Sequence, residues 1–279
     1  MTVPAGWAGQ LFEAARQSER SYFAAGAQTV SGQGWHASVM EGLTRLPAAC
    51  VGYLDRPEPD GGALQLAAAE RAFTELGASV IRLYTSLPSA FDEGLAAAGY
   101  EGRVERVFAF DLRDRRHEGA PEARLVDDEG AWRLKARIHA GLVRSSDGHE
   151  AAPADWLDME RRKVEAGGLL MFLFGEPGGP PVSTAGLIPL PGGVMRAKNL
   201  LVRADARGRG AGRALLRGLL AEAARRGASD LVVLAVEGSV GERLYRGAGG
   251  VDIGGLREWA RPLALRSDWP IRQAEGGRP

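Results

Sequence analysis

The sequence predicts an α/β protein built from two similar halves, each of which reads strand, helix, strand, helix, strand. Three observations support this fold class. The 279 residues have a globular composition, with 45% apolar and 25% charged residues. Apolar, β-branched runs alternate with alanine-rich amphipathic stretches. The same order of segments occurs twice along the chain at a constant spacing.

The repeat has an offset of 150 residues. Gly-Ala-Ser at 77–79 recurs at 227–229, and Ala-Gly at 98–99 recurs at 248–249, with no gap between the two anchors. We interpret this repeat as a duplication. The matching segments are an amphipathic helix at 67–76 and 213–226, a strand at 80–84 and 231–236, and a final strand at 104–110 and 250–259.

The second copy is longer and carries further elements before the repeat. We expect a first strand at 124–126, helices at 129–140 and 153–166, and strands at 168–174, 182–190 and 195–202. Pro-Gly-Gly at 191–193 is typical of a hairpin turn. A polar segment with Gly and Pro at 113–123 separates the copies. We therefore predict domains at 1–115 and 116–266 and a flexible tail at 267–279.

Charge and composition exclude several classes of protein. The 35 basic and 35 acidic residues balance, whereas a general nucleic-acid binder or a polybasic membrane-surface protein carries a basic excess. The single cysteine, Cys50, allows no intrachain disulfide. We find neither an apolar run of the about 20 residues that a bilayer span needs nor a secretory signal. We expect a cytoplasmic enzyme or binding protein without a nucleic-acid or membrane partner.

A glycine-rich turn between a strand and a helix is the most informative segment. It contains Gly208, Gly210 and Gly212, and arginines stand at 207, 209 and 213. The start of a helix presents unpaired N–H groups and the positive end of the helix dipole, and both favour an anion such as phosphate. Glycines let the backbone approach that ligand closely. The Gly-Lys-Ser/Thr of a P-loop and the third glycine of a dinucleotide fingerprint are missing.

The spacing Arg-x-x-Gly-x-Gly at Arg207, Gly210 and Gly212 resembles the acyl-CoA loop of the GNAT acetyltransferase superfamily. The resemblance covers residues 122–263. It includes Gly-Glu-Arg-Leu-Tyr-Arg-Gly-Ala-Gly-Gly at 241–250, which is similar to the family's Ala-x-x-Leu-Tyr-x-x-x-Gly-Phe signature.

The chain departs from the family pattern at three positions. Glycine replaces the signature's alanine at Gly241, its phenylalanine at Gly250, and the family's frequent upstream asparagine at Gly238. Glycine lowers helix propensity. These departures indicate a looser second helix or room for a bulky acceptor, and they leave the phosphate loop untouched.

The resemblance implies two tandem GNAT-like domains, each with a mixed central sheet flanked by helices, a fold that some schemes class as α+β. It also implies acetyl-CoA or another acyl-CoA as cosubstrate, held through its diphosphate by backbone amides. One cysteine and four scattered histidines lack metal-ligand spacing, so no metal is expected. The residues carried over as the cofactor site are Leu201, Val202, Arg203, Arg207, Gly208, Arg209, Gly210, Ala211, Gly212 and Arg213.

Acyl transfer from a thioester to an amine needs a base, an oxyanion donor and a proton for the leaving thiolate. By resemblance, Tyr245 is the acid and a backbone N–H at about 201–203 is the donor. Relatives carry a carboxylate on the strand before the loop, but 196–199 reads Arg-Ala-Lys-Asn, so the base stays open. Glu237, after the next strand, is the first candidate, and His139, at a helix end, is the second.

The resemblance also places the connection at 141–152 over the acceptor site. That connection contains groups able to bind an ammonium or a peptide, although a solvated loop is an equal reading for any single residue. These groups are Ser145, Ser146, Asp147, His149 and Glu150.

The first copy lacks the features of the loop. Acids would repel a diphosphate, and proline has no N–H to donate. We therefore expect a degenerate domain that does not hold CoA, and that supports the sheet and walls one side of the acceptor cleft. Trp35, His36 and Phe91 are either part of that wall or buried core. At the offset of 150, Arg207, Gly210, Gly212 and Tyr245 correspond to Pro57, Asp60, Gly62 and Leu95.

The expected function is acetyl-CoA-dependent acylation of a primary amine on a small molecule, namely an amino acid, an amine metabolite or an antibiotic. A peptide or protein N-terminus, or a lysine, is the alternative acceptor. A non-catalytic acyl-CoA-binding sensor is the alternative from another class, because the strand carboxylate is missing. We expect a small-molecule amine as partner and a monomer or homodimer.

Overall fold

The computed structural model describes residues 6–55, 62–113, 119–140 and 153–263. The described residues contain eleven β-strands. They are β1 (Gln28–Gly32), β2 (Trp35–Val39), β3 (Cys50–Leu54), β4 (Val80–Ser86), β5 (Glu101–Asp111), β6 (Glu122–Leu125), β7 (Leu170–Gly175), β8 (Ser183–Leu190), β9 (Val194–Val202), β10 (Asp230–Val236) and β11 (Val251–Pro262).

 The α-helices are α1 (Trp7–Ala24), α2 (Ala63–Glu75), α3 (Asp92–Ala97), α4 (Glu129–His139), α5 (Pro153–Glu165), α6 (Ala211–Arg225) and α7 (Val240–Gly247).

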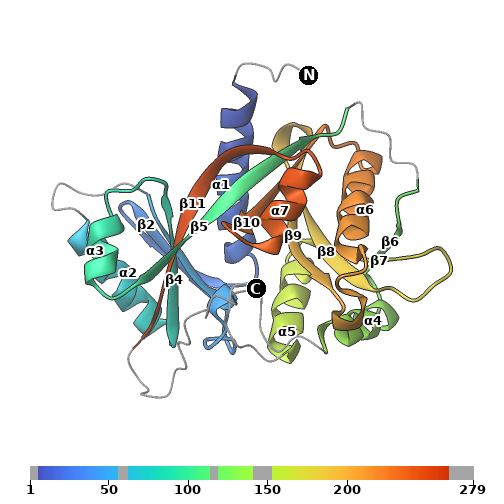
Figure 1. Cartoon of the computed structure of the whole chain (residues 1–279). Coiled ribbons are helices and arrows are strands. Elements are labelled where there is room, and N and C mark those ends of the chain that lie inside the picture. Colours follow the sequence, from blue (N-terminus) through green and yellow to red (C-terminus); the bar gives the residue numbers. More distant parts are fainter. Residues whose placement is uncertain (1–5, 56–61, 114–118, 141–152, 264–279) are drawn as a thin grey trace.

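Within the described residues, the strands form one mixed sheet of eleven strands that runs through both halves of the molecule (Figure 1). Its order is β1-β2-β3-β4-β11-β5-β10-β9-β8-β7-β6. The predicted fold class, a mixed α/β protein with two similar halves, is confirmed. The sequence predicted a sheet for each half, and the structure joins the two sheets edge to edge.

The duplication is visible in the bounds of the elements. The bounds of β10 are those of β4 shifted by 150 residues, and β5 and β11 begin 150 residues apart. The helices α2 and α6 precede β4 and β10, and α3 and α7 follow them. The chain repeat therefore corresponds to a structural repeat of helix, strand, helix and strand.

The final strands of the two halves are exchanged. The last strand of the first copy, β5, pairs with β10 of the second copy, starting at Asp111 opposite Asp230. The last strand of the second copy, β11, pairs with β4 of the first copy, where Pro262 lies opposite Val80. The two exchanged strands also pair with each other, antiparallel. Each half therefore completes the sheet of the other.

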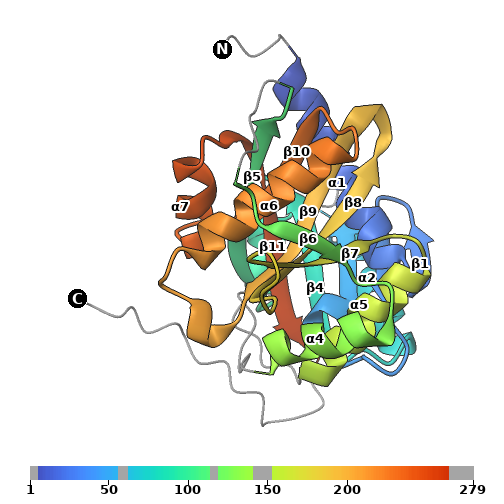
Figure 2. The ribbon, with the colours of Figure 1, turned by 90° about the vertical axis from the view of Figure 1, so that its right-hand side faces the viewer.

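Helices cover both faces of the C-terminal half (Figure 2). One face packs under α6 and α7, in a core that includes Phe108, Leu216, Leu219 and Val233. The opposite face packs under α1, α4 and α5, in cores that include Trp132. The long helix α1 contacts strands of both halves, from β2 and β3 to β8 and β9. The separation of these faces leaves the start of α6 on one side of the sheet and α1 on the other.

Candidate functional site

The strands β9 and β10 run parallel and then separate, which opens the sheet in the C-terminal half. Their pairing ends at Ala197 and Val233, although β9 continues to Val202 and β10 continues to Val236. In the part of β9 that no longer pairs with β10, Asn199 has a φ of 55°. There the pairing of β9 with β8 has an irregular register. The sheet is therefore split between β9 and β10 at the ends that lead to the glycine-rich loop and to Glu237.

The loop after β9 leads to an open start of α6. Gly208 and Gly210 have φ values of 74° and 84°, and Gly210 is the N-cap of α6 without a side-chain hydrogen bond. A Cβ added to either glycine would meet no atom within 4 Å, and residues 207–210 are exposed. The first amides of a helix have no intrahelical acceptor. The amides at 211–213 are thus available to an anion, as the sequence predicted.

The loop carries an excess of positive charge. Residues 203–213 contain four arginines and one aspartate, which gives a formal charge of +3. Arg203 is paired with Asp205 at 2.6 Å, and Arg207 donates from Nε to the carbonyl of Val202 at 3.0 Å. Arg209 and Arg213 are exposed. Positive charge beside a helix start strengthens the attraction for a diphosphate.

One backbone amide of β9 faces the split between β9 and β10. It belongs to the segment at 201–203 in which the sequence predicts the oxyanion donor. The N–H of Arg203 donates to the carbonyl of Val182 at 2.9 Å, so this amide serves the connection to β8. Backbone groups of successive strand residues point to alternate sides. The Val202 N–H therefore faces the split, on the same side as the Val202 carbonyl that Arg207 binds.

Tyr245 lies on α7, whose first turn is closed by a capping box. Ser239 accepts the N–H of Glu242 at 3.1 Å, and the Glu242 carboxylate accepts the N–H of Gly238 at 2.6 Å. Tyr245 is 5% exposed, and its ring centroid lies 6.0 Å from that of Phe108 on the exchanged strand β5. Burial raises the pKa of the phenol above its ordinary value, so Tyr245 carries its proton at neutral pH.

Glu237 is exposed in the turn after β10. Its N–H donates to the carbonyl of Val104 on β5 at 2.9 Å, which ties this turn to the first half of the chain. Its placement at the open end of the split agrees with the predicted location, and its role as the base stays a prediction.

His139 is enclosed in a buried network of α4, α5 and β9. Lys135 Nζ lies 2.7 Å from His139 Nε2 and 2.5 Å from a Glu160 carboxylate oxygen, and Glu160 also accepts the side-chain amide of Asn199 at 2.9 Å. Burial, and then the charge of Lys135, lower the pKa of His139 to about 4. The imidazole is neutral and packed, which favours a structural role over that of a base.

The first half of the chain closes the groove that the second half leaves open. Gly62 is the N-cap of α2, as Gly210 is of α6, and a Cβ on Gly62 would lie 2.1 Å from the ring of Phe91. Phe91 is 3% exposed and belongs to the core. At the offset of 150 its place is taken by Gly241, where an added Cβ has ordinary contacts of 3.5 Å or more.

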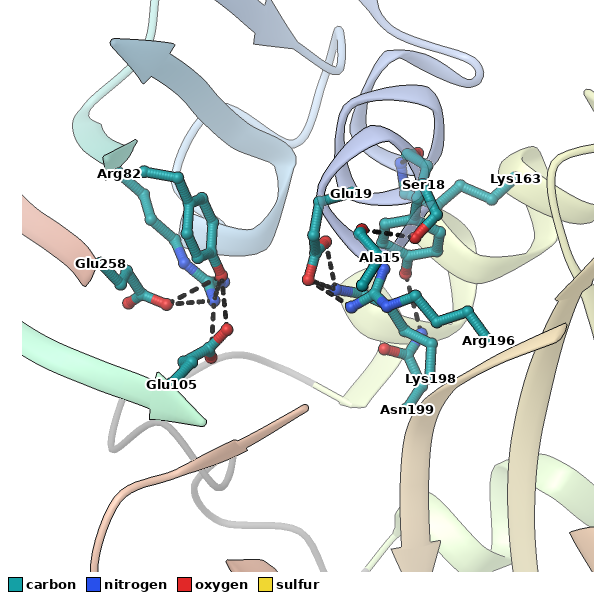
Figure 3. A network of polar contacts seen from close by, with 12 residues as sticks. Ala15, Ser18, Glu19, Arg82, Glu105, Lys163, Arg196, Lys198, Asn199 and Glu258 are labelled. Atoms are coloured by element: carbon teal, nitrogen blue, oxygen red, sulfur yellow. Dashed lines mark hydrogen bonds and ion pairs between the residues drawn. The ribbon is translucent and has the colours of Figure 1, made fainter. Parts of the chain in front are cut away.

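Two clusters of buried charge face each other where the halves meet (Figure 3). On one side, Glu19 of α1 pairs with Arg196 of β9 and, at 2.8 Å, with Lys198. On the other side, Glu105 of β5 and Glu258 of β11 lie around Arg82 of β4 (Figure 3). Sequence reasoning missed these carboxylates. The available signal was an acid inside an apolar strand, as at Glu105.

Several predicted features lie outside the described residues. They are the connection at 141–152, the tail at 267–279, and Pro57 and Asp60 of the first copy. Among the residues that are described, no group of three His, Cys, Asp or Glu side chains is arranged to hold a metal ion. None of the helices in the described ranges is long and apolar enough to cross a bilayer.

Comparison with known proteins agrees with this geometry. Residues 137–249 match the family model described as the acetyltransferase (GNAT) family. No curated protein matches the chain by sequence. The match region contains the glycine-rich loop, the split strands β9 and β10, and the whole of α7.

Solved structures resemble the whole chain. A GCN5-related N-acetyltransferase from Kribbella flavida has a TM-score of 0.64 at 14% identity, covering 92% of this chain and 96% of that one. A tandem GNAT protein from the clavulanic acid biosynthesis pathway has a TM-score of 0.57 at 13% identity, with 91% and 94% covered. A GCN5-related N-acetyltransferase from Sphaerobacter thermophilus has a TM-score of 0.55 at 18% identity, with 82% and 76% covered.

The fold and the family match together define an acyltransferase. The C-terminal half of the chain, through residues 137–249, belongs to the acetyltransferase (GNAT) family, and the chain has a fold like that of a tandem GNAT protein. Membership implies an acyl-CoA cosubstrate. The open, positively charged start of α6 fits the diphosphate of that group, because its amides and glycines leave the space that a phosphate needs.

Proposed function

We propose that this protein transfers an acetyl group from acetyl-CoA, held by its C-terminal half, to the primary amine of a small molecule such as an amino acid, an amine metabolite or an amine-bearing antibiotic. The observation that carries the proposal is the exposed, uncapped start of α6, directly after a strand that has separated from its parallel neighbour. The amides at 208–213 bind the diphosphate, and Arg209 and Arg213 add positive charge.

Two further groups have roles in the transfer. The Val202 N–H, which faces the split, donates to the thioester oxygen as negative charge develops there. Tyr245 donates a proton to the departing thiolate, and burial, which raises the pKa of the phenol, keeps that proton on Tyr245 at neutral pH until the thiolate forms. The base is a carboxylate beside the split strands, and Glu237 is the candidate that the sequence offers.

A small acceptor is favoured over a peptide because helix α1 covers the face of the sheet opposite α6. Glu19 of α1 is fully buried and pairs with Arg196 and Lys198, which flank the point where β9 leaves β10. An extended peptide needs an open groove with free backbone groups along its length. The helix restricts the approach to the split strands, so a compact amine fits better.

We expect Tyr245→Phe to lower kcat by about 10²–10⁴-fold, the usual contribution of a positioned proton donor. Affinity for CoA should stay within twofold of the wild type, because phenylalanine keeps the aromatic ring and removes only the hydroxyl. Stopped-flow thiol release and calorimetric titration with CoA measure the two quantities. Tyr100→Phe is the matched control, since Tyr100 is a buried tyrosine of the first half. Wild-type turnover by Tyr245→Phe would remove the residue from this role.

Thiol release from acetyl-CoA with a panel of amines tests the proposed function. The panel contains free amino acids, polyamines, aminoglycosides and short peptides with free N-termini. Turnover on single small amines supports the proposal, and faster turnover on peptides supports the alternative acceptor. CoA binding without turnover on any amine would support the acyl-CoA sensor, the alternative that the missing carboxylate on β9 motivates.

A further inference from the structure

Glu105 reaches the split between β9 and β10 from the first half of the chain. It lies on the exchanged strand β5, directly opposite Val236 of β10, three residues beyond the last pair that β10 makes with β9. Glu105 lies in the buried cluster with Tyr84, whose hydroxyl donates to it at 3.2 Å, and Arg82. Its next inward neighbour on the same face, Val107, packs with α1. The Glu105 carboxylate therefore lies on the α1 face of the sheet.

The opposite side of the split also faces this carboxylate. Lys198 is the first residue of β9 beyond its last pair with β10. Burial is the largest effect on Lys198 and lowers its pKa. The charge of the Glu105 carboxylate is among the effects that raise it, so the two groups interact. Figure 3 shows Glu105 on one side and Lys198 with Glu19 on the other. An acceptor amine held between these two groups would lie beside the split strands.

Glu105 and Glu258 share Arg82 and Tyr84 but differ in their proton affinity. Burial, and then the Glu258 carboxylate, raise the pKa of Glu105 above its ordinary value, against the attraction of Arg82. Burial acts on Glu258 in the same direction, but Arg82 and Arg103 outweigh it and lower its pKa to about 2. Glu258 is 2% exposed at its side chain and held by both arginines, whereas the Glu105 side chain is 12% exposed. Of the pair, Glu105 is the stronger base and the more accessible one.

We propose that Glu105 accepts the proton of the acceptor ammonium, so that the first half of the chain supplies the base for the reaction at the second half. This inference rests on the proposed function. Glu105 takes one proton from the ammonium nitrogen, and the freed lone pair forms the C–N bond to the thioester carbon. The C–S bond breaks with its electron pair on sulfur, which takes a proton from Tyr245. The amide nitrogen releases its second proton, which restores the Tyr245 phenol.

The test compares three glutamine variants, Glu105→Gln, Glu258→Gln and Glu237→Gln, by the pH dependence of kcat/KM for the best amine of the panel. The charged and titratable groups that face Glu105 are Arg82, Tyr84, Arg103, Glu258, Glu19 and Lys198. We expect Glu105→Gln to lower kcat by at least 100-fold and to remove the acidic limb of the profile, with CoA affinity unchanged. Glu258→Gln should keep that limb but shift it to lower pH, because the Glu258 charge raises the pKa of Glu105, and Glu237→Gln tests the alternative base.

If Glu105→Gln keeps the acidic limb and the wild-type kcat, the assignment is overturned. If the limb is lost in Glu237→Gln instead, the role of base belongs to Glu237. If Glu105→Gln does not fold, Glu105→Asp replaces it, and a carboxylate moved back by one carbon should lower kcat and keep the limb. An unchanged kcat in Glu105→Asp would also overturn the assignment. Absence of thiol release from the wild type with every amine would overturn the proposed function itself.

A different observation concerns Arg196. This residue is 1% exposed, and it donates from Nη2 to Glu19, yet its Nε and Nη1 atoms are buried without a hydrogen-bond partner. Glu19 is shared with Lys198, so one carboxylate serves two cations. Buried donors without acceptors are costly. The cluster therefore lacks an acceptor oxygen and a negative charge, and Lys198, with a side chain 13% exposed, lies at its accessible edge.

We further infer that the acceptor amine also bears a carboxylate, which binds at Arg196 and Lys198 while its amine faces Glu105. This rests on the proposed function and names the substrate class as amino acids. Free L-amino acids are compared with their C-terminal amides by thiol release. We expect at least a tenfold preference in kcat/KM for the acids, abolished in Arg196→Met combined with Glu19→Gln, which removes both partners of the ion pair.

The matched control is Arg261→Met, because Arg261 also pairs with a glutamate, Glu70, at 2.7 Å, but in the first half of the chain. It should keep the preference. Equal kcat/KM for acids and amides in the wild type would overturn this inference while leaving acetyl transfer intact. A preference retained in the Arg196→Met, Glu19→Gln variant would also overturn it.

Discussion

Gly210 combines two properties that CoA binding needs. It is the N-cap of α6 at a φ of 84°, and it leaves open space where a side chain would stand. We expect Gly210→Val to weaken CoA binding at least tenfold. The valine side chain would occupy the open space beside the first amides of α6 that the diphosphate needs, and a loss of about 1.4 kcal/mol in binding free energy is already a factor of ten.

Calorimetric titration with CoA measures this effect. Gly227→Val is the matched control, because Gly227 has a φ of 83° and equal open space, but it follows the far end of α6. It should lose similar stability and keep its affinity for CoA. Equal affinity of Gly210→Val and wild type would refute the loop as the cosubstrate site.

The three lysines of the chain lie in the polar networks between α1, α4, α5 and β9. Lys135 and Lys163 are at most 1% exposed, and Lys198 binds Glu19. Lys163 donates to the carbonyl of Tyr22 at 2.6 Å and lies 4.4 Å from the centre of the Tyr22 ring. Burial, and then the charge of Lys198, lower the pKa of Lys163 to about 7.

The lysine pKa predicts how stability depends on pH. Between pH 7 and the ordinary lysine pKa of 10.5, the unfolded chain binds more protons at Lys163 than the folded chain does, so stability rises with pH. The slope per fully titrating group is about 1.4 kcal/mol per pH unit. Urea unfolding between about pH 7 and 8.5 should show a smaller slope in Lys163→Met. Arg162→Met, at the adjacent half-exposed position, should keep the wild-type slope, and the same slope in both variants would contradict the prediction.

At the scale of elements, the two halves differ in the space beside the helix that precedes the repeated strand. This space is filled beside α2 in the first half and left open beside α6 in the second. Phe91 lies against Gly62 in the first half, and Gly241 holds the matching position in the second. We expect Gly241→Phe to place a ring near the start of α6 and to weaken CoA binding at least tenfold, with little change in melting temperature. Titration with CoA tests this, with Gly247→Phe on the same helix as control. Wild-type affinity in Gly241→Phe would show that the ring does not reach the groove.

Sequence reasoning predicted the elements whose signals are local. The expected strand at 231–236 is β10, the expected helix at 213–226 is α6, and the hairpin turn at 191–193 lies between β8 and β9. The glycine-rich loop before α6 was predictable for the same reason, because its glycines and arginines are neighbours in the chain, and its binding of a phosphate stays a prediction. Helix α1 was missed, although its apolar residues recur with helical spacing.

The charged clusters were not predictable, because they depend on contacts between distant elements. Glu105 meets the split strands only through the exchange of β5, and Glu19 meets Arg196 across 177 residues of chain. No local pattern specifies such a pairing. Carboxylates of two other elements, β5 and α1, therefore lie near the split although β9 itself has none.

At the scale of the whole molecule, the exchange of β5 and β11 makes each half depend on the other. Separate chains of residues 1–118 and 119–279 would each lack one final strand and carry the other half's strand unpaired. Unpaired edges favour association. We expect each fragment alone to unfold without a cooperative transition and the co-expressed pair to copurify with near wild-type melting. Circular dichroism and size-exclusion chromatography test this. Cooperative melting of either fragment alone would contradict it.

The exchanged strands also set the order of events during synthesis. Because β11 ends at Pro262, the ribosome must have made both copies before the N-terminal sheet can acquire its last neighbour beside β4. Strand β5, made far earlier, waits unpaired for β10. The nascent N-terminal half thus cannot mature as an independent unit on the ribosome, and termination before β11 leaves β4 without its last neighbour even when β5 has already paired with β10.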